Sequence, residues 1–189
     1  MDAARQHEEQ NNSSTLVVPQ RTLLVLCGPA GSGKSTFADQ LVDTNKHNEL
    51  KPTSIVSSDT CRALVCDDDN NQQASRDAFD LFYFIIDKRM YQSRFTIADS
   101  TALLADTRRR ILEGARRHQY FTCLLIFNIS ADICLMNDQK RKRAVGKQVI
   151  DYHSGLLKQT LLAVLDEGWN QIHIINEQSA IMQLEIAPA

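Results

Sequence analysis

The sequence predicts an α/β fold in which a parallel sheet of four or five strands is flanked by helices. Five short runs of apolar or β-branched residues have the length and composition of buried strands, and they span residues 22–27, 54–57, 95–98, 121–129 and 171–175. Segments with helical spacing separate these runs, from residue 35 onward and at residues 71–94, 105–118 and 145–167. Strands joined by helical crossovers pair in parallel and are covered on both faces.

Each predicted helix carries an apolar stripe that would face the sheet. Phe37, Ala38, Leu41 and Val42 follow the first strand at helical spacing. The three later helices repeat the pattern, and their apolar members are Ala74, Ala78, Leu81, Phe82, Ile85 and Met90, then Ile111, Leu112 and Ala115, then Val149, Tyr152, Leu156, Leu157, Leu161 and Leu165.

The N-terminal segment and the overall composition are typical of an ordinary globular protein with a polar tail. Residues 1–20 are polar and predict a disordered tail, followed by one domain over residues 21–189. Hydrophobic content is 43% and the formal net charge is −2. No apolar run approaches a membrane span, the N-terminus lacks a secretory signal, and the five cysteines form no zinc pattern. These features predict a cytoplasmic protein with reduced thiols and no membrane partner.

The loop between the first strand and the first helix carries a phosphate-binding motif. Gly28-Pro29-Ala30-Gly31-Ser32-Gly33-Lys34-Ser35 fits the P-loop pattern G-x-x-x-x-G-K-[ST]. The glycines let backbone N–H groups curl around a phosphate, and the following helix adds the positive end of its dipole. We expect these residues and Thr36 to bind ATP, with Lys34 at the β- and γ-phosphates and Ser35 at Mg²⁺. The alternative is a glycine-rich turn that binds nothing.

Ligands of open α/β sheets bind beyond the carboxyl ends of the strands, where Asp59 follows the second predicted strand. Arg62 lies three residues further on, on the same face of a helical turn. A carboxylate beside a P-loop is suited to accept the proton of an attacking hydroxyl, and an arginine to grip a phosphate on the acceptor. The structural alternative is that Asp59 caps a helix and that Arg62 is its surface partner.

Two further segments supply candidate residues. Asp99 ends the third predicted strand, as the magnesium-holding Walker B carboxylate does, and its alternative is again a helix cap. The basic run at residues 108–110 predicts a solvated face, with Arg108 as the member that would face an acceptor.

A small helical lid is predicted at residues 136–148, between two helices. This segment contains five cations, which are Lys140, Arg141, Lys142, Arg143 and Lys147. In small P-loop kinases a lid closes over the triphosphate from such a place, and its cations neutralise charge that develops in the transition state. The alternative is a solvated basic helix.

Several segments in order resemble the kinase module of bacterial polynucleotide kinase-phosphatase. They read GPAGSGKSTFA, KPTSIVSSDTCRALVCDDDNNQ, AFDLFYFIIDKRM, TIADST and VIDYHSGLLKQTL, and the resemblance covers residues 21–175. It implies an adenylate-kinase-like P-loop fold and transfer of the γ-phosphate of ATP to the 5′-hydroxyl of RNA or DNA in end repair. It implies that Lys34 and Ser35 hold the nucleotide phosphates and Mg²⁺, that Asp59 is the general base, and that Arg62 binds the acceptor's 3′ phosphate. It also places Lys140, Arg141 and Arg143 in the lid.

The sequence departs from this family at two motifs. The family's strand-end motif D-A-T-N reads D-S-T-A here, so Ala102 replaces its Asn. The family's lid pattern R-N-x-x-R-x-x-R begins here with Met136 and has Lys140 at its second arginine, with Arg141 adjacent, and it matches at Arg143. Lysine lacks the bidentate fork of arginine, so weak turnover or a different acceptor is expected unless an unaligned arginine substitutes.

Three hypotheses therefore stand. The chain is a 5′-hydroxyl polynucleotide kinase, a P-loop phosphotransferase with a small-molecule acceptor, or a weakly catalytic NTP-binding module. The sequence is compatible with a homodimer. It does not distinguish RNA from DNA as acceptor or ATP from GTP as donor.

Overall fold

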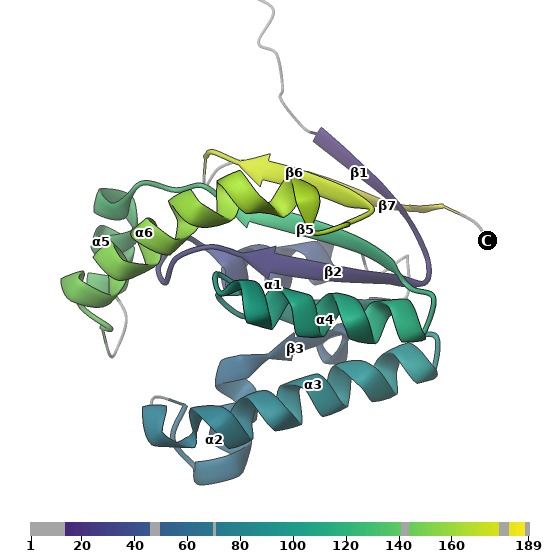
Figure 1. The fold of residues 1–189 in the computed structure, drawn as a ribbon, viewed down its shortest axis with the longest axis horizontal. Coiled ribbons are helices and arrows are strands. Elements are labelled where there is room, and N and C mark those ends of the chain that lie inside the picture. Colours follow the sequence, from purple (N-terminus) through teal and green to yellow (C-terminus); the bar gives the residue numbers. More distant parts are fainter. Residues whose placement is uncertain (1–13, 46–49, 70, 141–143, 178–181, 188–189) are drawn as a thin grey trace, which may run out of the picture.

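Strands and helices alternate along the chain in the computed structural model, which describes residues 14–45, 50–69, 71–140, 144–177 and 182–187 (Figure 1). The elements in order are β1 (Ser14–Pro19), β2 (Thr22–Cys27), α1 (Lys34–Thr44), η2 (Pro52–Ser54), β3 (Ile55–Ser57), α2 (Ser58–Cys66), η3 (Gln72–Ala74), α3 (Ser75–Tyr91), β4 (Thr96–Asp99), α4 (Ala105–Arg117), β5 (Phe121–Phe127), α5 (Ala131–Gln139), α6 (Lys147–Ala163), η4 (Val164–Asp166), β6 (Gln171–Ile175) and β7 (Met182–Ala187).

Five strands form a parallel sheet in the order β3-β4-β2-β5-β6, which confirms the predicted α/β fold. All six residues of the central strand β2 are buried, as expected for a strand covered on both faces. Asp99 pairs with Leu26 of β2 and with Ser57 of β3. The ends of these three strands therefore meet at one edge, where the loop after β2 and the first turn of α2 begin.

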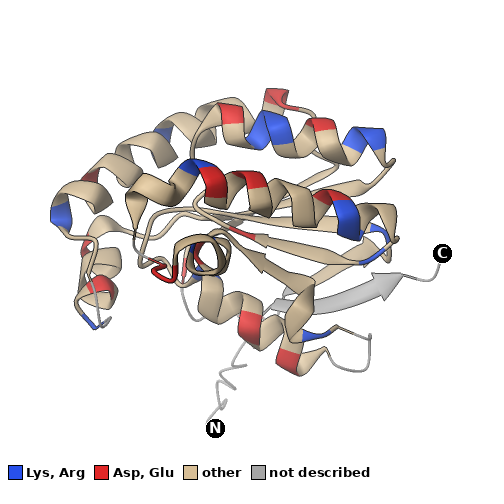
Figure 2. Cartoon of the chain, turned by 90° about the horizontal axis from the view of Figure 1, so that it is seen from below, with Lys and Arg blue, Asp and Glu red and all other residues tan. Residues whose placement is uncertain are grey.

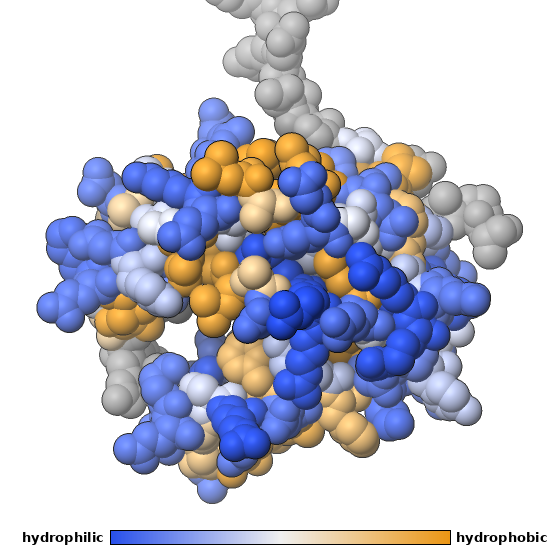
Figure 3. All heavy atoms as spheres, in the orientation of Figure 1, coloured by the Kyte–Doolittle hydropathy of each residue, from blue (hydrophilic) through white to orange (hydrophobic). Residues whose placement is uncertain are grey.

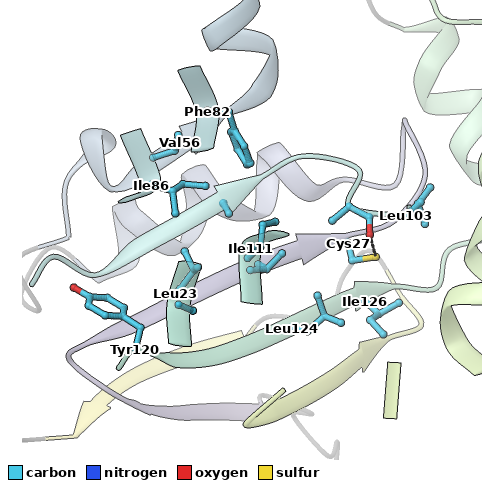
Figure 4. Close-up of a cluster of buried hydrophobic side chains, with 14 of the residues drawn as sticks. Leu23, Cys27, Val56, Phe82, Ile86, Leu103, Ile111, Tyr120, Leu124 and Ile126 are labelled. Carbon is cyan, nitrogen blue, oxygen red and sulfur yellow. Dashed lines mark hydrogen bonds between the residues drawn. The ribbon is translucent and has the colours of Figure 1, made fainter. Parts of the chain in front are cut away.

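Side chains on the two faces of the sheet build separate cores. On one face, alternate strand residues such as Leu23, Leu124 and Ile126 pack against Phe82 of α3 and Ile111 of α4 (Figure 4). The opposite face packs against α1, α5 and β1, and its buried members include Leu24, Leu26, Leu41, Val42, Leu125 and Cys134. This alternation explains why the strands read as continuous apolar runs in the sequence.

The expectation of a disordered tail through residue 20 is wrong for residues 14–19, which form β1 and pair in parallel with β7. Leu16 and Val18 are each 1% exposed while Val17 between them is 47% exposed, so the segment alternates as a strand does. Only three apolar residues mark it in a polar surrounding, and its partner strand lies at the other end of the sequence. Residues 1–13 lie outside the described part of the chain.

The surface alternates in charge and is mostly hydrophilic. Acidic and basic residues follow one another along the helices (Figure 2), and some form ion pairs, such as Arg110 with Asp80 and Lys147 with Asp151. Hydrophobic residues on the face in Figure 3 gather in several separate patches. Within the described ranges, none of the helices has both the length and the apolarity that crossing a membrane requires.

Candidate active site

The loop from Gly28 to Gly33 leaves the central strand and leads directly into α1. Gly33 is the N-cap of α1 with a φ of 96°, a left-handed conformation that glycine adopts without strain. Gly31 has a φ of 79°, and a Cβ there would overlap the backbone carbonyl of Cys134 in α5. The Gly28 N–H donates to the carbonyl oxygen of Thr101 at 2.9 Å. The loop is therefore held between α5 and the segment after β4.

Lys34 lies inside this loop, with 8% of its surface exposed. Its Nζ donates to the carbonyl oxygens of Gly28 at 2.9 Å and Pro29 at 2.6 Å, and contacts Ser32 Oγ at 3.3 Å. The ammonium group thus spans the concave side of the loop and is held by backbone dipoles. A phosphate bound in this loop would meet both the cation and the N-terminus of α1.

Ser35 and Asp99 form a polar pair at the edge where β2 and β4 end. Ser35 Oγ donates to Asp99 Oδ2 at 2.8 Å, and Asp99 is 6% exposed. Burial raises the pKa of Asp99, and the charge of Lys34 and the Ser35 hydrogen bond oppose this increase. A hydroxyl and a carboxylate are hard oxygen ligands, so the pair fits Mg²⁺. Within the described residues there is no group of three or more His, Cys, Asp or Glu side chains that could hold a metal ion.

Asp59 lies in the first turn of α2, but it does not cap that helix. The cap is Ser57, whose Oγ accepts from the N–H groups of Asp59 and Thr60 at 3.3 and 3.5 Å. The Asp59 carboxylate instead accepts from Arg62 Nη1 at 2.7 Å, and its side chain is 66% exposed. The capping part of the structural alternative is therefore wrong, while the pairing of Asp59 with Arg62 is present.

Arg62 is buried although it carries a charge, and 5% of its surface is exposed. Its Nη1 also donates to the carbonyl oxygen of Asp69 at 2.7 Å, while its buried Nε has no hydrogen-bond partner among the described residues. Buried donors of this kind are usually satisfied, so this Nε is an exception within the site.

These residues share one cleft of about 470 Å³. Residues after three adjacent strands line it, together with residues of α3 and α6, and they are Ala30, Lys34, Ser35, Ser58, Asp59, Arg62, Gln72, Ser75, Phe79, Asp99, Ser100, Thr101, Ala144, Val145, Val149 and His153. Figure 3 shows the surface hollowed between α2 and the ends of α5 and α6. The structure thus brings together Lys34, Ser35, Asp59, Arg62 and Asp99, as the strand-end argument anticipated.

A second hollow of about 420 Å³ is lined by other residues of the same loop, Gly31, Ser32 and Gly33. Thr36 and Lys140 also line it, and Phe37 and Phe127 contribute aromatic rings with centroids 5.4 Å apart. The phosphate-binding loop therefore borders two hollows. One is lined by carboxylate and cationic side chains, and the other by two aromatic side chains.

The predicted lid corresponds to the end of α5, the start of α6 and the segment between them. Asn137 Nδ2 donates to the Gly31 carbonyl oxygen at 2.8 Å, so α5 contacts the phosphate-binding loop directly. Asp138 is fully buried and accepts from the N–H groups of Val145 at 3.1 Å and Gly146 at 2.9 Å. Arg141 and Arg143 lie outside the described residues, and their roles stay predictions.

Three functional candidates escaped the sequence analysis. Asn137 and Asp138 of α5 make the hydrogen bonds described above. Two adjacent polar residues in a helix are a weak sequence signal for such contacts. His153 of α6 accepts from the Ala30 N–H through Nδ1 at 3.3 Å and lines the cleft. Burial lowers the pKa of His153, and the charge of Lys34 lowers it further. Nothing in the spacing of the histidines distinguished this one.

Arg108 does not face the cleft as the sequence analysis suggested. It is 1% exposed, and its Nε and Nη2 donate to the Glu167 carboxylate at 2.6–3.0 Å. Its Nη1 donates to the carbonyl oxygens of Ala102 and Leu103 at 2.9 and 2.8 Å. A buried arginine with a carboxylate partner forms a structural clamp behind the site.

Comparisons with known proteins agree with this architecture. Residues 23–161 match the family described as AAA domain. No curated protein matches the sequence.

Solved structures with the same fold include kinases with different acceptors. A protein of the Pnkp1/Rnl/Hen1 RNA repair complex superposes with a TM-score of 0.64 at 18% identity, over 82% of this chain and 48% of that chain. A candidate kinase from Chloroflexus aurantiacus J-10-fl gives 0.59 at 14% identity, over 85% of this chain and 87% of that chain. A gluconokinase from Sinorhizobium meliloti 1021 superposes with a TM-score of 0.54 at 12% identity, over 84% of this chain and 83% of that chain. At these identities the likeness shows the fold alone.

Proposed function

Because the chain belongs to the AAA domain family and has the fold of a P-loop kinase-like phosphotransferase, we propose that it transfers the γ-phosphate of ATP to the 5′-hydroxyl of a nucleic acid. The observation that carries this proposal is the Asp59–Arg62 pair in the cleft beside the phosphate-binding loop. An exposed carboxylate and a buried guanidinium three residues apart present a base and a phosphate-binding group to one acceptor.

In the proposed reaction, the acceptor oxygen attacks the γ-phosphorus of ATP. The new O–P bond forms as the bond between the γ-phosphorus and the β–γ bridging oxygen breaks, and ADP leaves with that oxygen. Asp59 takes the proton of the hydroxyl, which also orients the oxygen for in-line attack. Lys34 offsets the negative charge on the β- and γ-phosphates, as its place within the loop supports.

The rest of the site would hold the donor. Ser35 and Asp99 would hold Mg²⁺, which when bound neutralises charge on the β- and γ-phosphates. The nucleoside of ATP would occupy the second hollow, against Phe37 and Thr36, with Lys140 at its edge. Arg141 and Arg143 are proposed to supply lid cations.

The wall of the cleft favours a nucleotide over a sugar acid as acceptor. Phe79, Val145 and Val149 contribute apolar surface to the cleft beside its charged groups. An apolar wall suits a nucleobase, and the Arg62 guanidinium, which lines the same cleft, suits a phosphate attached to the same nucleoside. Because a gluconokinase shares this fold, a small polar molecule is the second candidate for the acceptor.

A transfer assay tests the proposal. The protein is incubated with Mg²⁺, γ-labelled ATP and 5′-hydroxyl RNA or DNA of the same sequence, with gluconate as the competing acceptor. We expect label on the nucleic acid. Asp59→Asn should lower kcat by about 10²–10⁴-fold, since a general base contributes about that much. Glu113→Gln, an exposed change on α4, should leave the rate unchanged.

Acceptors of minimal size test Arg62 separately. A nucleoside 3′-phosphate should accept label far better than the same nucleoside without the phosphate, and Arg62→Ala should abolish that difference. Label on gluconate but not on nucleic acid would overturn the polynucleotide assignment. ATP binding without transfer to any acceptor would instead support a weakly catalytic module, in keeping with Met136 in place of a lid arginine.

A further inference from the structure

His153 lies outside the phosphate-binding loop in sequence but forms a hydrogen bond with it. It lies on α6, 123 residues from Ala30 in sequence, and its Nδ1 accepts the Ala30 N–H at 3.3 Å. Both residues line the cleft that contains Lys34 and Asp59. The neighbouring Tyr152 ring lies 6.1 Å away between centroids and is turned by 42°. No step proposed so far uses this imidazole.

The contact with Ala30 determines which nitrogen of His153 carries its proton. A backbone N–H can only donate, so Nδ1 must be unprotonated. A neutral imidazole then carries its hydrogen on Nε2. Burial and the Lys34 cation both lower the pKa of His153, which favours this neutral form. The ring therefore has one hydrogen-bond donor in a fixed tautomer, on a side chain that lines the cleft.

A donor is needed at this place if ATP binds as proposed. The γ-phosphate would lie in the cleft near Lys34, and its oxygens need donors beyond one lysine and the backbone. Met136, near the end of α5, carries no donor and is not among the residues that line the cleft. His153 is the remaining side chain with a donor on the α6 side of the cleft among the described lining residues.

We propose that His153 is a γ-phosphate contact, in which Nε2–H donates to a phosphate oxygen while Nδ1 keeps its hydrogen bond to Ala30. This inference rests on the proposed ATP binding and adds one residue to that site. A ligand without a γ-phosphate does not reach the contact. His153 therefore distinguishes nucleoside triphosphates from diphosphates, independently of the acceptor.

Two substitutions separate the roles of the two ring nitrogens. In His153→Asn the amide oxygen can still accept from Ala30, but no donor remains at the ε position. In His153→Gln an amide N–H lies at the ε position. The measurement is calorimetric binding of ADP and of a non-hydrolysable ATP analogue, each with Mg²⁺, without any acceptor. His173→Asn on β6 is the matched control, because it makes the same change outside the cleft.

We expect His153→Asn to lower the affinity for the ATP analogue about tenfold, which is the loss typical of one hydrogen bond to a charged group. Binding of ADP should stay within about twofold of wild type, and His153→Gln should restore most of the loss for the analogue. Equal weakening of both nucleotides would mean that His153 only supports the loop and would overturn the proposal, as would unchanged binding of the analogue. If the wild type bound neither nucleotide, the proposed function would fail, and this inference with it.

Discussion

Among single residues of the candidate site, Asp99 carries a carboxylate that is far more deeply buried than that of Asp59. The carboxylate is buried beside the Ser35 hydroxyl, and burial raises its pKa. A carboxyl whose pKa is higher in the folded than in the unfolded chain stabilises the fold only while it is protonated. That stability is lost as the pH rises through the folded pKa, so at neutral pH the charged group destabilises the free protein.

Asp99→Asn should therefore stabilise the free protein at pH 7. The amide oxygen can still accept from Ser35, but the buried charge is gone. We expect a gain of roughly 1 kcal/mol in the free energy of unfolding, or a rise of about 2–4 °C in Tm. Thermal unfolding without nucleotide measures this change.

Addition of Mg²⁺ and ATP should make the wild type more stable than Asp99→Asn. The wild type gains stability by binding the nucleotide, whereas the variant lacks a residue proposed to hold Mg²⁺. A lower Tm for free Asp99→Asn than for wild type would show that its charge is compensated within the fold.

Among the elements, α5 connects the phosphate-binding loop to the predicted lid. Asn137 contacts Gly31, and the next residue, Asp138, accepts from the backbone of Val145 and Gly146 just before α6. One buried carboxylate thus joins the end of α5 to the two residues just before α6.

Asp138→Ala should loosen the base of the lid, since it leaves two backbone N–H groups without their acceptor. Each orphaned donor costs about 1–3 kcal/mol if it stays buried, so the segment should open to water instead. We expect faster hydrogen exchange at Val145 and Gly146. The exposed Asp151→Ala should leave exchange there unchanged, and unchanged exchange in Asp138→Ala as well would show that the anchor does not hold the segment.

For the whole molecule, the clamp made by Arg108 joins segments that lie far apart in the sequence. Its guanidinium contacts Glu167, Thr160 and the carbonyl oxygens of Ala102 and Leu103. Burial acts to raise the pKa of Glu167, but hydrogen bonds from Arg108 and Trp169 and the Arg108 charge outweigh it and lower the pKa overall. The clamp therefore fixes the segment after Asp99 against the end of α6.

Arg108→Met should destabilise the whole domain, because it removes the cation that pairs with the partly buried Glu167 carboxylate. It also takes one of the donors from Glu167, which keeps the Trp169 N–H, and one from each of two carbonyl oxygens. Removal of one partner of a buried ion pair costs about 3–5 kcal/mol. Urea unfolding measures the change, and the exposed neighbour Arg109→Met should alter stability by less than about 0.5 kcal/mol. Equal stability of the two variants would argue that the clamp contributes nothing net.

The sequence by itself determined the features that depend on local order. The strand–loop–helix context of the P-loop, the five strands of the main sheet and the placement of Asp59 and Asp99 after strands follow from periodicity and from the backbone freedom of glycine. Parallel strands end at one edge, so these residues had to converge. The chemical roles of Asp59, Arg62 and Asp99 remain predictions.

Only the tertiary structure decided the contacts between distant segments. His153 reaches Ala30 across 123 residues, Arg108 reaches Glu167 across 59, and β1 pairs with a strand near the other end of the chain. Such partners are selected by how helices pack on the sheet, and a single sequence carries no local signal for that choice. The physical reason is that periodicity specifies which face of an element is buried, while packing specifies what that face meets.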